Sequence, residues 1–314
     1  MRRGWVIVVT ILLGLALACN LPMALNPPVL PTETSLPSSS ASPTMVFTAT
    51  PVLLSRDLLE NMEYTLPVGL DGGEVSFRLT NGVFQRGEDP AAVNFMEVRL
   101  GDGLAFGDLN DDGLPDAAVL LAANFGGTGV FVWVVAVLNR DGRGEQAGLY
   151  FVDDRPRVES LQIKDARIEL EGVIHGPNDP GCCPNQPVRR GLRLTPAGLK
   201  LVSASTQLGD LWHEINLEAP PENSRVGERV EVKGGVPVMP FEATLNYRIS
   251  SETGVDYQYS YLMVDAPDYG YPGTFQETID LGSVPPGVIY LEVFELSAAD
   301  GSVLALQAVR LIRE

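Results

Sequence analysis

Oxygen-bearing side chains alternate in the stretch GDLNDDGLPD, residues 107–116. Asp108, Asn110 and Asp112 occupy every second position, and a glycine and a fourth acidic residue follow. Calcium takes about six to eight oxygen ligands, and alternate side chains of a tight loop converge on it where a glycine allows the turn. The sequence therefore predicts a structural calcium ion. Its predicted ligands are the side chains of Asp108, Asn110, Asp112 and Asp116 and the backbone carbonyl of Leu114.

This loop differs from an EF-hand, which needs a bidentate Glu at the position where this chain has Val119. Apolar segments that favour strands stand on either side of it, Leu104–Phe106 before and AAVLLAA after. In that setting FGDLNDDGLPDAAV resembles the calcium loops of FG-GAP and VCBS repeats. A β-propeller would repeat the loop in every blade, and the sequence has no second copy. The alternative is a polar turn without metal, because Asp, Asn and Gly form turns readily.

Two adjacent cysteines, Cys182 and Cys183, lie in the proline-rich stretch HGPNDPGCCPNQPVRR. Neighbouring Cα atoms are about 3.8 Å apart, closer than the about 4.4–6.8 Å usual for a disulfide. Outside the cytoplasm two adjacent thiols nevertheless tend to oxidise, so we predict a vicinal disulfide in a stiff loop. Free or intermolecular thiols, and metal ligation together with His175, remain as alternatives.

Catalytic patterns are missing from the sequence, and we expect no catalytic residues. His213 begins HEINL, which departs from the zinc motif H-E-x-x-H because Leu217 replaces the second His. We interpret His213 as a boundary residue. No G-x-S-x-G elbow occurs. The alternative functions are a hydrolase whose carboxylates lie far apart in the sequence, or a redox or metal protein centred on Cys182 and Cys183.

Tyrosines cluster in DYQYSYLMVDAPDYGYPG. Tyr is enriched at contact surfaces, because its ring is apolar and its hydroxyl is polar. The cluster is therefore a candidate contact surface, and ordinary strand and turn composition is the alternative. Its members are Tyr257, Tyr259, Tyr261, Tyr269 and Tyr271.

The first 18 residues, MRRGWVIVVTILLGLALA, predict a signal peptide. Their apolar run is shorter than the about 20 residues that span a bilayer. The string LALAC resembles a bacterial lipobox, which implies cleavage before Cys19 and lipidation of its sulfur. The expected result is an extracytoplasmic protein anchored to the membrane by lipid. Ordinary secretion and an uncleaved anchor are the alternatives.

Residues 19–51 are rich in Pro, Ser and Thr, and we predict a disordered tether there. The whole chain has a formal net charge of −18. Such a chain repels nucleic acid and anionic lipid, so we exclude nucleic acid as a partner.

Short alternating segments split by Gly, Asp, Asn and Pro predict a mainly β fold. Residues 52–208 are expected to form an antiparallel β domain that carries the calcium loop. In residues 214–314 short strands recur at the spacing of an immunoglobulin-like β-sandwich.

The second region contains, in order, P-x-x-x-S-x-V-G, V-x-V-x-G, PFEATLNYRI, GTFQETIDL and LEVFELSAADGS. This order is similar to the immunoglobulin-like domain associated with bacterial spore germination proteins. The resemblance implies a non-enzymatic extracytoplasmic domain that often occurs on lipoproteins. The predicted function is therefore non-catalytic binding, adhesion or envelope organisation. A sporulation or germination accessory is a further alternative, although the usual partner domain of that family is not recognisable in this chain.

Overall fold

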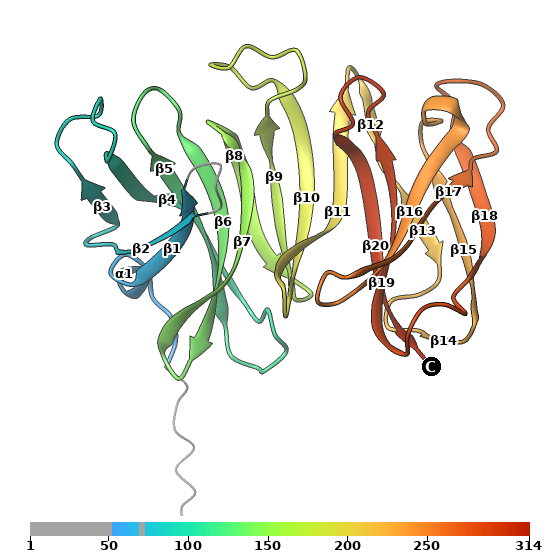
Figure 1. Ribbon diagram of the computed structural model, residues 1–314, viewed down its shortest axis with the longest axis horizontal. Coiled ribbons are helices and arrows are strands. Elements are labelled where there is room, and N and C mark those ends of the chain that lie inside the picture. The colour runs from blue at the N-terminus through green and yellow to red at the C-terminus, as the bar shows by residue number, and fades with distance from the viewer. Residues whose placement is uncertain (1–51, 69–72) are drawn as a thin grey trace, which may run out of the picture. The chain divides into compact units, whose positions relative to one another are not determined.

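The computed structural model describes residues 52–68 and 73–314, and Figure 1 shows an almost entirely β structure. The predicted fold class is confirmed: the sheets are antiparallel except for one short parallel pair, and an immunoglobulin-like sandwich is present. The described residues belong to one compact unit. The only α-helix in the described ranges is the single turn α1, Arg56–Leu59, which begins after the N-cap residue Ser55. The predicted signal peptide and the whole of the predicted tether, including Cys19, lie outside the described residues.

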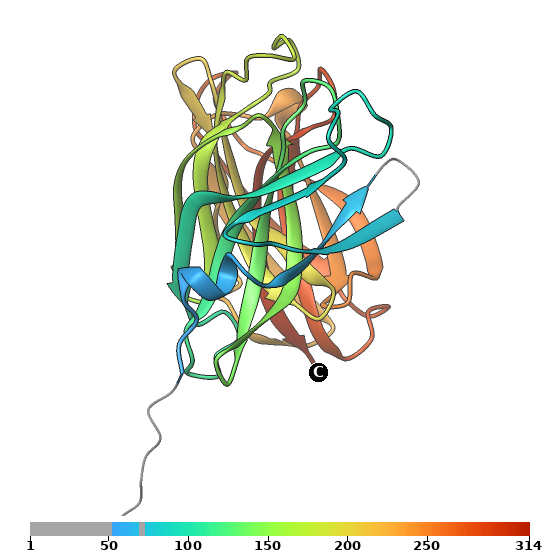
Figure 2. The same ribbon diagram turned by 90° about the vertical axis from the view of Figure 1, so that its left-hand side faces the viewer.

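The first part of the unit is built around a five-stranded sheet in the order β3-β4-β5-β6-β7. A two-stranded hairpin, β1–β2, covers one of its faces (Figure 2). The strands are β1 (Glu63–Val68), β2 (Gly73–Arg78), β3 (Val83–Arg86), β4 (Met96–Gly107), β5 (Asp116–Asn124), β6 (Phe131–Arg140) and β7 (Arg143–Asp154).

Strand β5 is buried on both faces, which explains its almost unbroken apolar sequence. Ala117, Val119 and Leu121 pack in a core with β1, β2 and α1. Ala118 and Leu120 point the other way and pack in a second core against β9 and β10. The five-stranded sheet is therefore the middle layer of three.

A ten-stranded sheet forms the third layer and continues into the C-terminal part of the chain. Its main path runs β17-β16-β19-β20-β11-β10-β9-β8. The strands are β8 (Arg157–Lys164), β9 (Arg167–Ile174), β10 (Gln186–Thr195), β11 (Gly198–Leu208), β12 (Leu211–His213), β14 (Arg225–Val226), β16 (Thr244–Ser251), β17 (Asp256–Met263), β19 (Gly287–Leu296) and β20 (Val303–Arg313). The link between the two predicted domains is the β11–β20 pair, which matches only Ser203 with Gln307 and Ala204 with Leu306.

The immunoglobulin-like sandwich consists of β16, β17, β19 and β20 facing a three-stranded sheet. That sheet contains β13 (Asn216–Ala219), β15 (Arg229–Val236) and β18 (Gly273–Asp280), and the 3-10 turn η1 (Phe241–Ala243) precedes β16. Along β15 every second residue is buried, as the alternation of Val with charged residues requires. Val230 and Val232 thus reach the same core as Leu291 on the opposing sheet.

The boundary between the middle part of the chain, which contains β8–β11, and the sandwich is called the joint below. Ion pairs stabilise this joint in addition to the two matched residue pairs of β11 and β20. The Glu292 carboxylate is 1% exposed and lies 2.6 Å from Lys200 Nζ and 2.5 Å from Arg248 Nη2. Buried His213 lies 2.9 Å from buried Glu295. In each pair that crosses the joint, the sandwich supplies the acid and the other part supplies the base.

We predict that Glu292→Gln destabilises the unit, because Lys200 loses its counter-charge and Arg248 keeps only Asp256, at 3.7 Å. Breaking a fully buried pair costs about 3–5 kcal/mol. Lys200 and Arg248 keep some solvent contact, so the expected loss is about 2–3 kcal/mol by urea denaturation. The control Glu277→Gln, exposed on β18, should change stability by less than about 0.5 kcal/mol. Equal effects of the two variants would contradict the role of the Glu292 cluster.

Candidate functional site

The Asp-rich loop connects the end of β4 to the start of β5, as the sequence predicts. The two Asp108 carboxylate oxygens accept hydrogen bonds from the backbone N–H groups of Asn110 and Asp112, both at 3.2 Å, and of Gly113 at 2.7 Å. The Asn110 amide donates to the Asp112 carboxylate at 2.8 Å. Three of the predicted ligands therefore lie together around one tight turn.

Asp116 is placed differently from the other predicted ligands. It is fully buried, and its two oxygens accept from the backbone N–H groups of Leu109 and Asn139, both at 2.8 Å. Burial raises the pKa of Asp116, and the nearby charges of Asp112 and Asp108 raise it further. Asp116 thus ties the loop to β6, a role that its spacing in the sequence did not reveal.

The donor set has the hard oxygens that calcium prefers. As described, however, the loop is closed by its own hydrogen bonds, and the Asn110 amide would have to turn its oxygen inward. Across the two described ranges, no group of three or more His, Cys, Asp or Glu side chains is arranged to hold a metal ion. Calcium binding by this loop stays a prediction.

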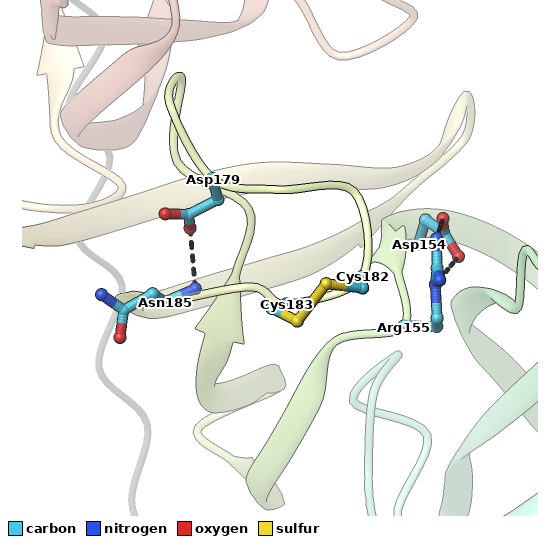
Figure 3. Close-up of a disulfide and its surroundings, with 6 residues drawn as sticks. All are labelled: Asp154, Arg155, Asp179, Cys182, Cys183 and Asn185. Carbon is cyan, nitrogen blue, oxygen red and sulfur yellow. Dashed lines mark hydrogen bonds and ion pairs between the residues drawn. A yellow bond between two sulfur atoms is a disulfide. The ribbon is translucent and has the colours of Figure 1, made fainter.

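The cysteine loop connects β9 to β10, and a disulfide joins Cys182 to Cys183 (Figure 3). Both cysteines are exposed. The Asp179 carboxylate accepts from the backbone N–H groups of Gly176 at 2.8 Å and Asn185 at 2.7 Å. These bonds hold the pKa of Asp179 below its usual value. The loop is thus braced across its base, independently of the sulfur atoms.

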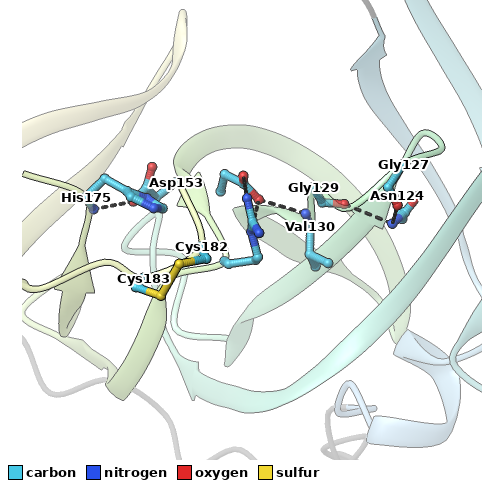
Figure 4. A network of polar contacts seen from close by, with 10 residues as sticks. Asn124, Gly127, Gly129, Val130, Asp153, His175, Cys182 and Cys183 are labelled. Carbon is cyan, nitrogen blue, oxygen red and sulfur yellow. Dashed lines mark hydrogen bonds and ion pairs between the residues drawn. A yellow bond between two sulfur atoms is a disulfide. The ribbon is translucent and has the colours of Figure 1, made fainter. Parts of the chain in front are cut away.

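His175, the alternative metal partner of the cysteines, is held by an aspartate. Its ring Nδ1 lies 2.8 Å from the Asp153 carboxylate, which also accepts from the His175 backbone N–H (Figure 4). Its Nε2 atom is buried without a hydrogen-bond partner. The neighbouring Asp154 accepts from Val130 N–H at 2.7 Å and pairs with Arg155. The start of the cysteine loop is therefore fixed to the end of β7.

The tyrosine cluster is exposed, and its role as a contact surface stays a prediction. Tyr257, Tyr259 and Tyr261 alternate along β17 with exposed fractions of 37%, 58% and 62%. Tyr269 and Tyr271 follow in the loop before β18 and are also exposed. The Tyr259 ring lies 5.9 Å from the Phe294 ring, and its hydroxyl donates to Asn246 at 3.0 Å.

A polar cleft of about 700 Å³ lies on the open face of β8–β11, and sequence reasoning did not find it. Two rows of residues cross these strands in register and form its floor. One row is Ser160, Glu171, Arg189 and Ser205, and the other is Gln162, Glu169, Gly191 and Ser203. The sequence does show polar residues at alternate positions of these strands. The cross-strand register that gathers them into rows cannot be read from it.

The start of the sandwich forms a wall of this cleft, through residues 214–216. Arg189 lies 3.4 Å from Glu171, and its guanidinium carbon stands 4.1 Å from the centre of the Trp212 ring. Arg190 lies under the floor and donates to the carbonyl of Ser205 at 3.0 Å. Burial lowers the pKa of Arg190. The contacts of Arg189 and Arg190 thus hold the floor of the cleft in place, and few apolar residues line it.

Residues 214–302 match the family described as the immunoglobulin-like domain of bacterial spore germination. This match confirms the resemblance for most of the C-terminal region and supports a non-catalytic accessory role. No curated protein matches the chain. Within the described ranges, no helix has the length and apolarity that crossing a membrane requires.

We predict that calcium raises the melting temperature of residues 49–314. A ligand at 100 times its Kd stabilises the folded state by about 2.7 kcal/mol. Asp112→Ala should abolish this shift, whereas Asp111→Asn, an adjacent change outside the predicted ligand set, should preserve it. If the melts with calcium and with chelator coincide, the loop is a polar turn without metal.

We also expect no titratable thiol in residues 49–314 before reduction and two afterwards. This fragment contains only two of the three cysteines of the chain, so the count reports on Cys182 and Cys183 alone. The measurement is thiol titration in denaturant, with the Cys182→Ser/Cys183→Ser double variant as the blank. Two thiols in the unreduced protein would contradict the disulfide.

Proposed function

We propose that this chain is a membrane-anchored, extracytoplasmic bacterial lipoprotein that binds a glycan segment of the cell envelope and leaves it chemically unchanged. The observation that carries this proposal is the polar cleft on β8–β11. Its volume of about 700 Å³ falls within the range of about 300–1,000 Å³ typical of ligand sites.

The chemistry of the cleft suits a ligand rich in hydroxyl groups. A sugar hydroxyl both donates and accepts hydrogen bonds, so it can pair with carboxylates, amides, serine hydroxyls and guanidinium groups alike. The two rows present all four kinds of group side by side. Gly191 has no side chain, and the Ser203 hydroxyl lies in the space where a Cβ atom would stand, so that it is presented at the middle of the floor.

Binding without catalysis is supported by the way the acidic side chains are used. Glu171, the nearest carboxylate to Arg189, is paired with it at 3.4 Å. The family match of the neighbouring sandwich also favours an accessory role. The location is supported by the signal-like sequence, the lipobox-like LALAC and the Pro/Ser/Thr-rich segment after Cys19. An anchor of this kind would hold the cleft among the glycans of the envelope.

A second candidate function is an accessory role in spore formation or germination, which the family match of residues 214–302 favours. Expression restricted to sporulating cells would support it. Equal expression in growing cells would count against it.

We predict that residues 49–314 bind at least one neutral hexasaccharide of glucose, N-acetylglucosamine or xylose, as measured by isothermal titration calorimetry. Gln162→Ala and Glu169→Ala should each weaken binding about tenfold, equivalent to about 1.4 kcal/mol. Gln276→Ala, exposed on β18 of the opposite sheet, is the matched control and should bind normally. Trp212 fluorescence provides a second readout, because Trp133 is buried in the core.

Failure of every hexasaccharide to bind at millimolar concentration would overturn the proposed ligand class. Chromatography of the sugars after long incubation tests the other half of the proposal. Shortened products that disappear in Glu169→Ala would show a hydrolase instead of a binding protein.

A further inference from the structure

The polar cleft continues past the ion pair of Arg189 and Glu171. A second hollow of about 280 Å³ lies on the same face of β8–β11, and these two residues line both hollows. The second hollow is called the side compartment below. Because the two hollows share the ion pair, they form one groove that crosses it.

Strand register explains why the side compartment has an apolar wall. Val173 of β9 pairs with Pro187 of β10, two residues along from the row of the cleft floor that contains Ser205. Trp212 of β12 pairs with Gln207, which follows Ser205 on the same face of β11. Val173, Pro187 and Trp212 all line the side compartment, and none of them lines the cleft. The groove therefore offers polar rows at one end and an apolar wall at the other.

The charged groups of the side compartment are paired with one another. Arg157 lies 3.0 Å from Glu159, and Arg189 lies 3.4 Å from Glu171. These four are the only charged residues among those that line the side compartment. Its net charge is zero, and a charged ligand would have to compete with both pairs. The side compartment thus favours a neutral ligand, as the cleft does.

Trp212 provides a surface on which a sugar ring can pack. The Arg189 guanidinium carbon stands 4.1 Å from the centre of the Trp212 ring, and the rest of the indole borders the side compartment. A sugar ring carries C–H groups on its face, and these pack against the negative face of an aromatic ring. The guanidinium of Arg189, which borders both hollows, can donate to sugar hydroxyls on either side.

We propose that the side compartment is a second binding site for the same glycan, and that Trp212 holds one sugar ring there. This inference rests on the proposed function, because the glycan that occupies the cleft continues across Arg189 into the side compartment. It adds a length requirement to that function. A short sugar fills the cleft alone and binds without Trp212, whereas a longer one gains the contacts of both hollows.

The test is isothermal titration calorimetry of the purified chain with the disaccharide and the hexasaccharide of the neutral sugar that binds. The hexasaccharide should bind at least about tenfold more tightly than the disaccharide. Trp212→Ala should weaken hexasaccharide binding about tenfold and change disaccharide binding by less than about twofold. Disaccharide binding by this variant also shows that it is folded. The control Tyr269→Ala removes an exposed aromatic side chain outside both hollows and should bind both sugars normally.

Tryptophan fluorescence of the unaltered chain gives a second measurement. The hexasaccharide should protect Trp212 from quenching by acrylamide, and the disaccharide should not. The protected signal should be absent from Trp212→Ala, which assigns it to this residue.

Equal protection by the two sugars, or a bound hexasaccharide that leaves Trp212 unprotected, would overturn the inference and leave the proposed function standing. Hexasaccharide binding that Trp212→Ala does not weaken would do the same. If neither sugar binds, the inference and the proposed glycan ligand are both wrong.

Discussion

The buried carboxylate of Glu292 is the interaction on which the arrangement of the two parts depends. An isolated buried charge is very costly, so Glu292 is tolerated only because Lys200 and Arg248 surround it. Lys200 belongs to β11 and Glu292 to β19, which fixes the middle part of the chain against the sandwich. The β11–β20 pairing alone, with its two matched residue pairs, would leave this joint weak.

Other acidic residues of the sandwich also pair with basic residues of the middle part across the joint. Glu222, in the loop between β13 and β14, lies 3.5 Å from Arg167 and 3.3 Å from Arg193. Glu295 pairs with His213. The joint thus collects bases on one side and acids on the other, in a chain whose overall charge is strongly negative. The polar cleft depends on this arrangement, because its floor belongs to β8–β11 and its wall to residues 214–216. A shift of the sandwich relative to β8–β11 would displace residues 214–216 and widen the cleft.

The fold class could be predicted from the sequence because strands leave a local signal. The alternation of Val with charged residues in β15 and the unbroken apolar run of β5 each follow from the layers that those strands contact. The exposed tyrosines of β17 follow from the same two-residue period. Contacts between distant residues leave no such signal. Asp116 shows the difference. Its spacing predicts a calcium ligand, but one of its carboxylate oxygens accepts a hydrogen bond from the backbone N–H of Asn139, which lies on a different strand. The cleft and the Glu292 cluster escaped prediction for the same reason, since both depend on register between strands.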